Sequence, residues 1–160
     1  MNIVYLHGLM SSNQSPKVDW LKNKNTVFNP YLNYKEDTET LFSDLKTICE
    51  ENKIDLIIGS SMGGYLGFHL SNKYNIPNLL FNPSLEKNKM VKPKVEEIKN
   101  SHVLHTLVLG RNDDVVIPSH TIGFMENGDF NYRVTLEENG HRTPIELLKK
   151  HFEWIENSKK

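Results

Sequence analysis

The stretch Gly59-Ser60-Ser61-Met62-Gly63-Gly64 decides the fold of this chain. The residues before it, 54–58, are apolar except for one aspartate, a composition typical of a strand buried on both faces. The residues after it, 65–70, are mostly apolar at helical density. A Gly-x-Ser-x-Gly turn between a strand and a helix raises the serine hydroxyl above the end of a sheet. We therefore interpret Ser61 as a candidate nucleophile, although such a motif also occurs by chance in Gly/Ser-rich turns.

The rest of the chain alternates strand-like and helix-like segments. Further strands are expected at 3–6, 26–29, 76–81, 103–109 and 132–136. Helices are expected at 16–21, 36–52, 65–70 and 91–99, after Pro118, and from Thr143 onward. In the last helix, Thr143-Pro144-Ile145-Glu146 predicts a capping box with proline at the first helical position. This alternation predicts a three-layer α/β sandwich, with helices on both faces of a mostly parallel sheet of about six strands.

The bulk composition predicts one globular domain over residues 1–160. Hydrophobic residues make up 38% of the 160 and charged residues 24%, which argues against disorder. The segment 85–101 is rich in lysine and glutamate and is the only candidate for a small lid. A net charge of −1 provides no field for nucleic acid or an anionic membrane, and no apolar stretch has transmembrane length. A single cysteine, Cys49, fits a reducing compartment. We expect a soluble cytoplasmic protein without nucleic-acid or membrane partners.

The chemically suggestive residues all follow predicted strands. Ligands of open parallel sheets bind at the carboxyl ends of the strands, so these residues should converge there. Ser61 follows the third strand, Asp113 and Asp114 follow the fifth, and His141 follows the sixth. The order nucleophile, acid, histidine along the chain is that of the α/β-hydrolases. In that chemistry His141 would take the proton of Ser61, and one of the two aspartates would orient the imidazole.

Further residues are candidates for binding the substrate. The backbone N–H groups of Met62 and Leu9 would bind an oxyanion, because one opens the helix and the other lies in the loop after the first strand. Candidates for lining the substrate pocket are His7, Met10, Ser60 and Ser84. His7 would alternatively hold the oxyanion loop, and the two serines would alternatively serve ordinary turns.

The sequence offers no metal or cofactor site. The seven histidines lack the His-Glu-x-x-His spacing, and one cysteine cannot form a zinc site with others of its kind. The glycine pattern is not Gly-x-Gly-x-x-Gly, and no Gly-Lys-Ser/Thr phosphate loop is present. We therefore expect a reaction that needs no metal ion and no cofactor.

Five motifs together resemble the α/β-hydrolase superfamily, and more narrowly the small bacterial esterases of the YqiA/YcfP type. These motifs are Tyr-Leu-His-Gly at 5–8, Gly-Ser-Ser-Met-Gly-Gly-Tyr at 59–65, Asn-Pro at 82–83, Gly-x-x-Asp at 110–113 and Gly-His at 140–141. The resemblance runs from residue 4 to about residue 155. It implies a Ser-Asp-His triad with Asp113 as its acid, and hydrolysis of a small acyl ester or thioester without a cofactor.

Two alternatives to esterase activity stay open. The same triad would also suit thioester or amide hydrolysis. The chain would otherwise be a hydrolase-like binding or interaction protein whose triad is not productively assembled. The chain also lacks room for the first two strands of a full-length hydrolase and has no large cap, so the resemblance leaves the substrate open.

Overall fold

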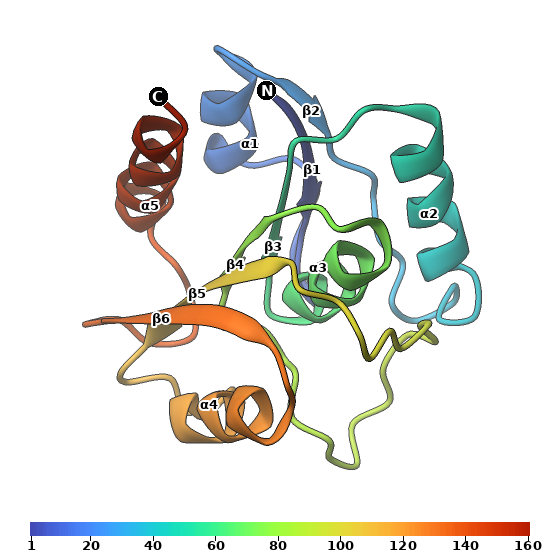
Figure 1. Cartoon of the computed structure of the whole chain (residues 1–160), viewed down its shortest axis with the longest axis vertical. Coiled ribbons are helices and arrows are strands. Elements are labelled where there is room, and N and C mark those ends of the chain that lie inside the picture. The colour runs from blue at the N-terminus through green and yellow to red at the C-terminus, as the bar shows by residue number, and fades with distance from the viewer.

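A single parallel sheet forms the centre of the molecule. The computed structural model describes all 160 residues, and its six strands lie in the order β2-β1-β3-β4-β5-β6, every neighbouring pair parallel (Figure 1). The strands are β1 (Asn2–Leu6), β2 (Thr26–Phe28), β3 (Leu56–Ser60), β4 (Asn78–Phe81), β5 (Leu104–Gly110) and β6 (Asn131–Glu137). The helices are α1 (Pro16–Lys22), α2 (Leu41–Glu51), α3 (Met62–Tyr74), α4 (Pro118–Asn127) and α5 (Ile145–Ser158). The predicted α/β class and strand number are confirmed.

Helices cover both faces of the sheet because successive residues of a strand point to opposite sides. In β1, Ile3 and Tyr5 pack against α1 and α5, whereas Val4 and Leu6 pack against α2 and α3. A third cluster joins α3 to α4 around Phe68. Burying each such side chain contributes roughly 1.5–3 kcal/mol, so the pattern of the central strands fixes the three-layer arrangement. No helix combines the length and the apolar character that crossing a membrane requires.

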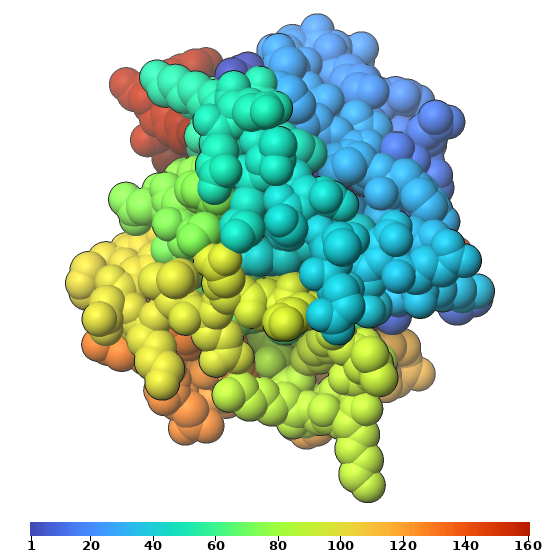
Figure 2. Space-filling view, turned by 90° about the vertical axis from the view of Figure 1, so that its right-hand side faces the viewer, coloured from blue at the N-terminus to red at the C-terminus, as the bar shows by residue number.

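The connection from β4 to β5 contains no helix, so the helix expected at 91–99 is wrong. We call residues 82–103 the crossover segment. Pro93 lacks a backbone N–H, which disfavours a helix interior, and the N–H of Lys94 donates to the carbonyl of Thr38 rather than within the segment (2.9 Å). Glu96 binds Lys46 of α2 (2.7 Å) and Lys73 of α3 (2.5 Å). These contacts hold the crossover segment extended across one side of the molecule (Figure 2).

The start of the last helix also differs from the prediction. Pro144 is extended, with φ −61° and ψ 151°, and α5 begins one residue later, at Ile145. The hydroxyl of Thr143 is buried and makes no hydrogen bond, so no capping box forms. The extended Pro144 moves the helix start past the position from which Thr143 would cap it. In contrast, α1 begins at Pro16 as predicted, and Ser15 caps it by accepting a hydrogen bond from the N–H of Val18 (3.4 Å).

Candidate active site

The turn from β3 to α3 holds Ser61 in an unusual backbone conformation. Its φ is 53° and its ψ is −116°, a region that costs a non-glycine residue of order 1–3 kcal/mol. Two neighbours hold it there: its N–H donates to the carbonyl of Phe81 (3.0 Å), and its carbonyl accepts from the N–H of Ser84 (3.0 Å). The carbonyl also accepts from the N–H of Tyr65 in the first turn of α3 (3.1 Å). The end of β4 and the helix therefore fix the serine above the sheet, as the motif predicted.

Two glycines of the motif are required by close approach of the backbone. A Cβ atom on Gly63 would lie 2.1 Å from the carbonyl oxygen of Leu6 in β1. A Cβ atom on Gly59 would lie 2.4 Å from the carbonyl oxygen of Gly63 itself. Because both contacts are with backbone, no side-chain rotation relieves them. The start of α3 can therefore pack this close to β1 and β3 only with glycine at both positions.

Ser61, His141 and Asp113 form a continuous chain of hydrogen-bonding distances. His141 Nε2 lies 3.1 Å from Ser61 Oγ, and His141 Nδ1 lies 2.8 Å from Asp113 Oδ2. An ionised carboxylate only accepts hydrogen bonds, so the ring proton of His141 belongs on Nδ1. This leaves Nε2 free to accept the proton of the serine hydroxyl.

The surroundings of Asp113 explain why this aspartate, and not its neighbour, faces the histidine. The Asp113 side chain is fully buried, and its Oδ1 accepts the backbone N–H groups of Val115 (2.8 Å) and Val116 (2.9 Å). Asp114 is exposed and makes no side-chain hydrogen bond or salt bridge. Of the two candidates, only Asp113 lies against His141.

A residue to which the sequence assigned no role, Asn82, ties the histidine loop to the sheet. Its φ is 44°, in the left-handed region that asparagine tolerates better than most residues. Its Nδ2 donates to the carbonyl of His141 (2.9 Å), and its Oδ1 accepts the N–H of Gly110 at the end of β5 (2.7 Å). The available signal was its place in the chain, directly after a buried strand and before a proline.

A cavity of about 210 Å³ adjoins the serine and the histidine. Of the predicted binding residues, the cavity is lined by Leu9, Met10, Met62 and Ser84. The N–H of Met62 opens α3 and so has no partner within the helix. The N–H of Leu9 makes no hydrogen bond in the protein. Neither N–H group therefore has a partner in the protein, and both residues line the cavity together with Ser61, as residues that bind an oxyanion would.

His7 and Ser60, the other predicted binding residues, lie outside this cavity. The backbone N–H of Leu32 donates to His7 Nε2 (2.9 Å), so the ring proton is on Nδ1 and is donated to the carbonyl of Gly8 (2.8 Å). Burial lowers the pKa of His7, which keeps the ring neutral. His7 therefore holds the loop that carries Leu9, the alternative considered from the sequence. Ser60 is the last residue of β3 and does not reach the cavity.

Comparison with known proteins identifies the family. Residues 2–123 match an uncharacterised protein family, UPF0227. The chain belongs to the UPF0227 family. No curated protein matches this UPF0227 chain.

Solved structures with the same fold are distant in sequence from this UPF0227 chain. A variant of SOBER1 from Arabidopsis thaliana is 15% identical, with a TM-score of 0.74 and full coverage of both chains. MGS-MChE2, described as an α/β hydrolase enzyme from the metagenome of sediments from the lagoon of Mar Chica, Morocco, is 18% identical, with a TM-score of 0.76, covering 99% of this chain and 92% of its own. The type II thioesterase BorB from the borrelidin biosynthetic cluster is 15% identical, with a TM-score of 0.68 and coverages of 96% and 87%. At these identities the likeness establishes the α/β-hydrolase fold.

A second, larger cavity of about 1130 Å³ lies in this UPF0227 chain between α3, α4 and the crossover segment. It shares Glu86, Asn88 and Met90 with the smaller cavity. This cavity was not predicted from the sequence, because its lining residues come from three separate parts of the chain. No group of three or more His, Cys, Asp or Glu side chains is arranged to hold a metal ion.

Proposed function

We propose that this chain is a serine hydrolase that cleaves small acyl esters through an acyl-enzyme on Ser61. One observation carries the proposal: Asp113, His141 and Ser61 form one chain of hydrogen-bonding distances, and Ser61 stands on a strained turn beside two free N–H groups. Strained backbone positions cluster at active sites, where the surrounding structure maintains them. The α/β-hydrolase fold supports the proposal by analogy alone.

The first half of the proposed reaction forms the acyl-enzyme. As Ser61 Oγ attacks the ester carbonyl carbon, His141 Nε2 takes its proton, and Asp113 stabilises the resulting imidazolium. The negative charge on the carbonyl oxygen is bound by the N–H groups of Met62 and Leu9, each worth roughly 3 kcal/mol of the barrier. The intermediate collapses when His141 returns the proton to the alcohol oxygen, which leaves with the electron pair of the broken C–O bond.

The second half regenerates the enzyme. Water attacks the acyl carbon while His141 takes one of its protons, and the second tetrahedral intermediate uses the same two N–H groups. Its collapse breaks the bond to Ser61 Oγ, which takes the proton from His141, and releases the carboxylic acid. A cavity of about 210 Å³ beside the serine favours a short acyl group.

The proposal extends to the domain organisation, the cellular location and the substrate class. The 160 residues would act as one catalytic domain, with residues 85–101 serving as a small lid, because the crossover segment borders both cavities. The reduced, buried thiol of Cys49 is consistent with a cytoplasmic location. The substrate would be a small ester, and a thioester is the next candidate because thioesterases such as BorB share the fold.

Covalent labelling tests the proposal. A fluorophosphonate probe followed by intact mass measurement should add one label to the wild type and none to Ser61→Ala. The matched control is Ser60→Ala, because this neighbouring serine lies outside the cavity and its variant should label normally. Acyl p-nitrophenyl esters of increasing length, and an acetyl thioester, would then rank the substrates. An unlabelled wild type, or a label that persists in Ser61→Ala, would contradict the proposal and favour a binding protein.

A further inference from the structure

The larger cavity lies beside the β4–β5 connection, which contains no helix. Its lining residues come from α3, from α4 with the turn after it, and from the crossover segment. Figure 1 shows where these elements lie in the fold. A network of buried hydrogen bonds determines which of the polar atoms that line the cavity are donors and which are acceptors.

A chain of buried hydrogen bonds fixes which atom Asn72 presents to the cavity. The backbone N–H of Thr106 donates to Asn78 Oδ1 (3.1 Å), so the amide nitrogen of Asn78 donates to His105 Nδ1 (2.7 Å). His105 is neutral, because burial lowers its pKa to about 4, and its proton is therefore on Nε2. Nε2 donates to Asn72 Oδ1 (2.9 Å). Asn72 lines the cavity, and its NH2 group, which makes no hydrogen bond in the protein, is left as a donor.

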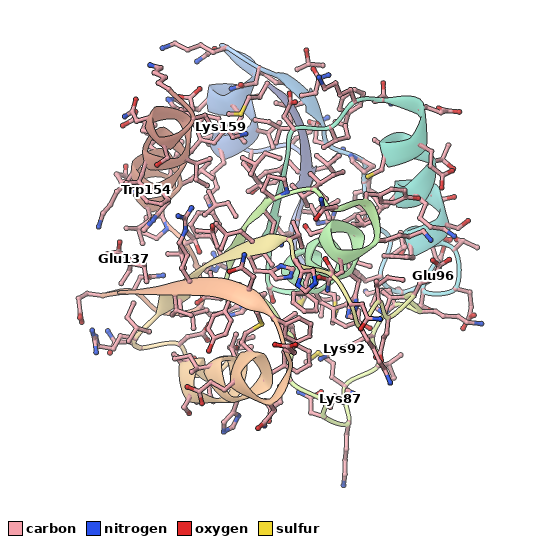
Figure 3. All side chains as sticks on the ribbon, in the orientation of Figure 1. Lys87, Lys92, Glu96, Glu137, Trp154 and Lys159 are labelled. Carbon is pink, nitrogen blue, oxygen red and sulfur yellow. The ribbon has the colours of Figure 1, made fainter.

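A half-buried cation without a carboxylate partner lines the same cavity. Lys92 Nζ donates to the backbone carbonyls of Ser84 and Glu86 and lies 5.1 Å from the centre of the Tyr65 ring. It takes part in none of the salt bridges of the structure. Figure 3 shows Lys92 and Lys87 on the crossover segment, on the side of the molecule where α4 lies. Charged groups removed from water are normally paired, so Lys92 is available to an anion from outside the protein.

His69 responds to the positive field of these lysines. Its ring is buried, lines the cavity, and leaves Nδ1 without a hydrogen-bond partner. Burial lowers the pKa of His69 to about 4, and the charges of Lys92 and Lys87 act in the same direction. The unpaired Nδ1 is itself inaccessible, so His69 contributes to the wall of the cavity rather than to its donors and acceptors.

None of the acidic residues of the cavity forms a salt bridge with Lys92. Burial lowers the pKa of Lys92 and the charge of Glu86 acts in the opposite direction, while Glu86 Oε2 lies 3.0 Å from His120 Nδ1. Glu97 and Asp129 are exposed, at the rim. The rim therefore disfavours a multiply charged anion, while the interior offers one ammonium and one amide donor, a set that suits a single carboxylate.

The remaining wall is apolar and aromatic. Phe68 meets Phe130 edge to face with ring centres 5.0 Å apart, and Phe124 stacks on Phe130 at 5.9 Å. All three line the cavity. A ligand that fills this space would therefore carry an apolar body next to its charged end.

We propose that the larger cavity binds an organic monocarboxylate with an aromatic or aliphatic body, held by the NH2 group of Asn72 and the ammonium of Lys92. Because this cavity and the smaller one share Glu86, Asn88 and Met90, one molecule can occupy both. If the proposed function holds, on which this extension rests, the substrate is the short acyl ester of a hydroxy acid. The acyl group lies beside Ser61, and the carboxylate of the leaving group lies in the larger cavity.

Binding is measured first, on Ser61→Ala protein, which requires no turnover. Isothermal titration compares 3-phenylpropanoate with neutral 3-phenylpropan-1-ol. We expect the carboxylate to bind at least about tenfold more tightly than the alcohol, and to lose at least about tenfold in affinity on Lys92→Gln, the loss of one charged hydrogen bond. Asn72→Asp keeps the acceptor that His105 uses and replaces the donor by a carboxylate, so it should weaken binding at least as much. The matched control is Lys89→Gln, which removes an equal charge from the same segment outside either cavity.

The outcomes separate this site from the proposed function. Equal binding of acid and alcohol, or equal affinity of Lys92→Gln and Lys89→Gln with melting temperatures showing both variants folded, would overturn the carboxylate site. On protein with Ser61 intact, kcat/KM for 3-(4-acetoxyphenyl)propanoate should exceed that for 4-ethylphenyl acetate about tenfold. Carboxylate binding without hydrolysis of either ester would uphold the site and refute the function. Hydrolysis of both esters at equal kcat/KM, with no carboxylate preference in binding, would uphold the function and refute the site.

Discussion

Replacing Asp113 by asparagine changes one atom facing His141 and should nearly abolish turnover. The retained oxygen can still accept the N–H groups of Val115 and Val116, so the new NH2 group takes the place of Oδ2, 2.8 Å from His141 Nδ1. An NH2 group donates, which forces the ring proton to Nε2. His141 can then no longer accept the proton of Ser61. In Ser-His-Asp hydrolases the wrong tautomer lowers kcat by about 10⁴, which corresponds to about 5.5 kcal/mol of barrier.

The assay for this prediction is hydrolysis of p-nitrophenyl acetate, with the melting temperature measured on the same samples. Asp113→Asn keeps the loop hydrogen bonds, so its free energy of unfolding should fall by no more than about 1–2 kcal/mol while kcat falls by about 10⁴. Asp114→Asn is the matched control, because this carboxylate is exposed and next in sequence. The reasoning is refuted if folded Asp113→Asn keeps more than about a tenth of wild-type kcat, or if Asp114→Asn is equally impaired.

Three further changes test the turn, the histidine loop and a buried histidine. Gly63→Ala places a methyl group 2.1 Å from backbone and should lower the free energy of unfolding by more than about 3 kcal/mol, whereas Gly123→Ala, in an open position of α4, should raise it by about 0.5–1 kcal/mol in urea titrations. Asn82→Asp removes the donor that holds the carbonyl of His141 and should lower kcat about tenfold in steady-state assays, with little change in KM. An unchanged kcat would mean that the position of the His141 loop does not depend on Asn82. Because burial lowers the pKa of His69 to about 4, the unfolded chain binds the extra proton below pH 6.5, so stability should fall as the pH falls. Between pH 6.5 and 5 this loss is about 2 kcal/mol, and urea titrations of His69→Phe should lack it; equal losses in variant and wild type would contradict this assignment.

Much of the fold and part of the site could be predicted because the signals were local. The strand, the glycines and the helix around Ser61 are contiguous in the sequence, and the resulting turn has the predicted form. The convergence of Asp113 and His141 followed from a general rule, since parallel strands bring their carboxyl ends to one edge of the sheet. The preference for Asp113 over Asp114 came only from the resemblance of Gly-x-x-Asp to a family pattern. The loop conformation supplies the physical reason, because the Asp113 carboxylate turns inward and that of Asp114 is exposed.

The remaining features depend on contacts between residues far apart in the chain. The charged composition of 91–99 suits a helix, but Pro93 and the salt bridges of Glu96 with α2 and α3 override that tendency. The role of Asn82 depends on a hydrogen bond to a loop 59 residues away, and the ring of His7 is oriented by the N–H of Leu32, 25 residues away. A structural role for His7 was foreseen, but no local pattern identifies these partners. The larger cavity is lined by α3, by α4 with the turn after it, and by the crossover segment, so no single local pattern predicted it.

The two ends of the chain lie close together, away from the candidate site. β1 begins at Asn2, and Lys159, just after α5, reaches Met1, with Nζ 3.4 Å from Sδ, while Ser61 follows the opposite end of β3 (Figure 1). An affinity tag or surface anchor on either terminus should therefore leave the cavity beside Ser61 open to substrate. A short peptide joining the two ends would allow circular permutation, with new termini cut into the exposed part of the crossover segment. Such a permutant would release one end of the crossover segment, which borders both cavities. The sheet and the hydrogen-bonded Ser61 and His141 would stay in place.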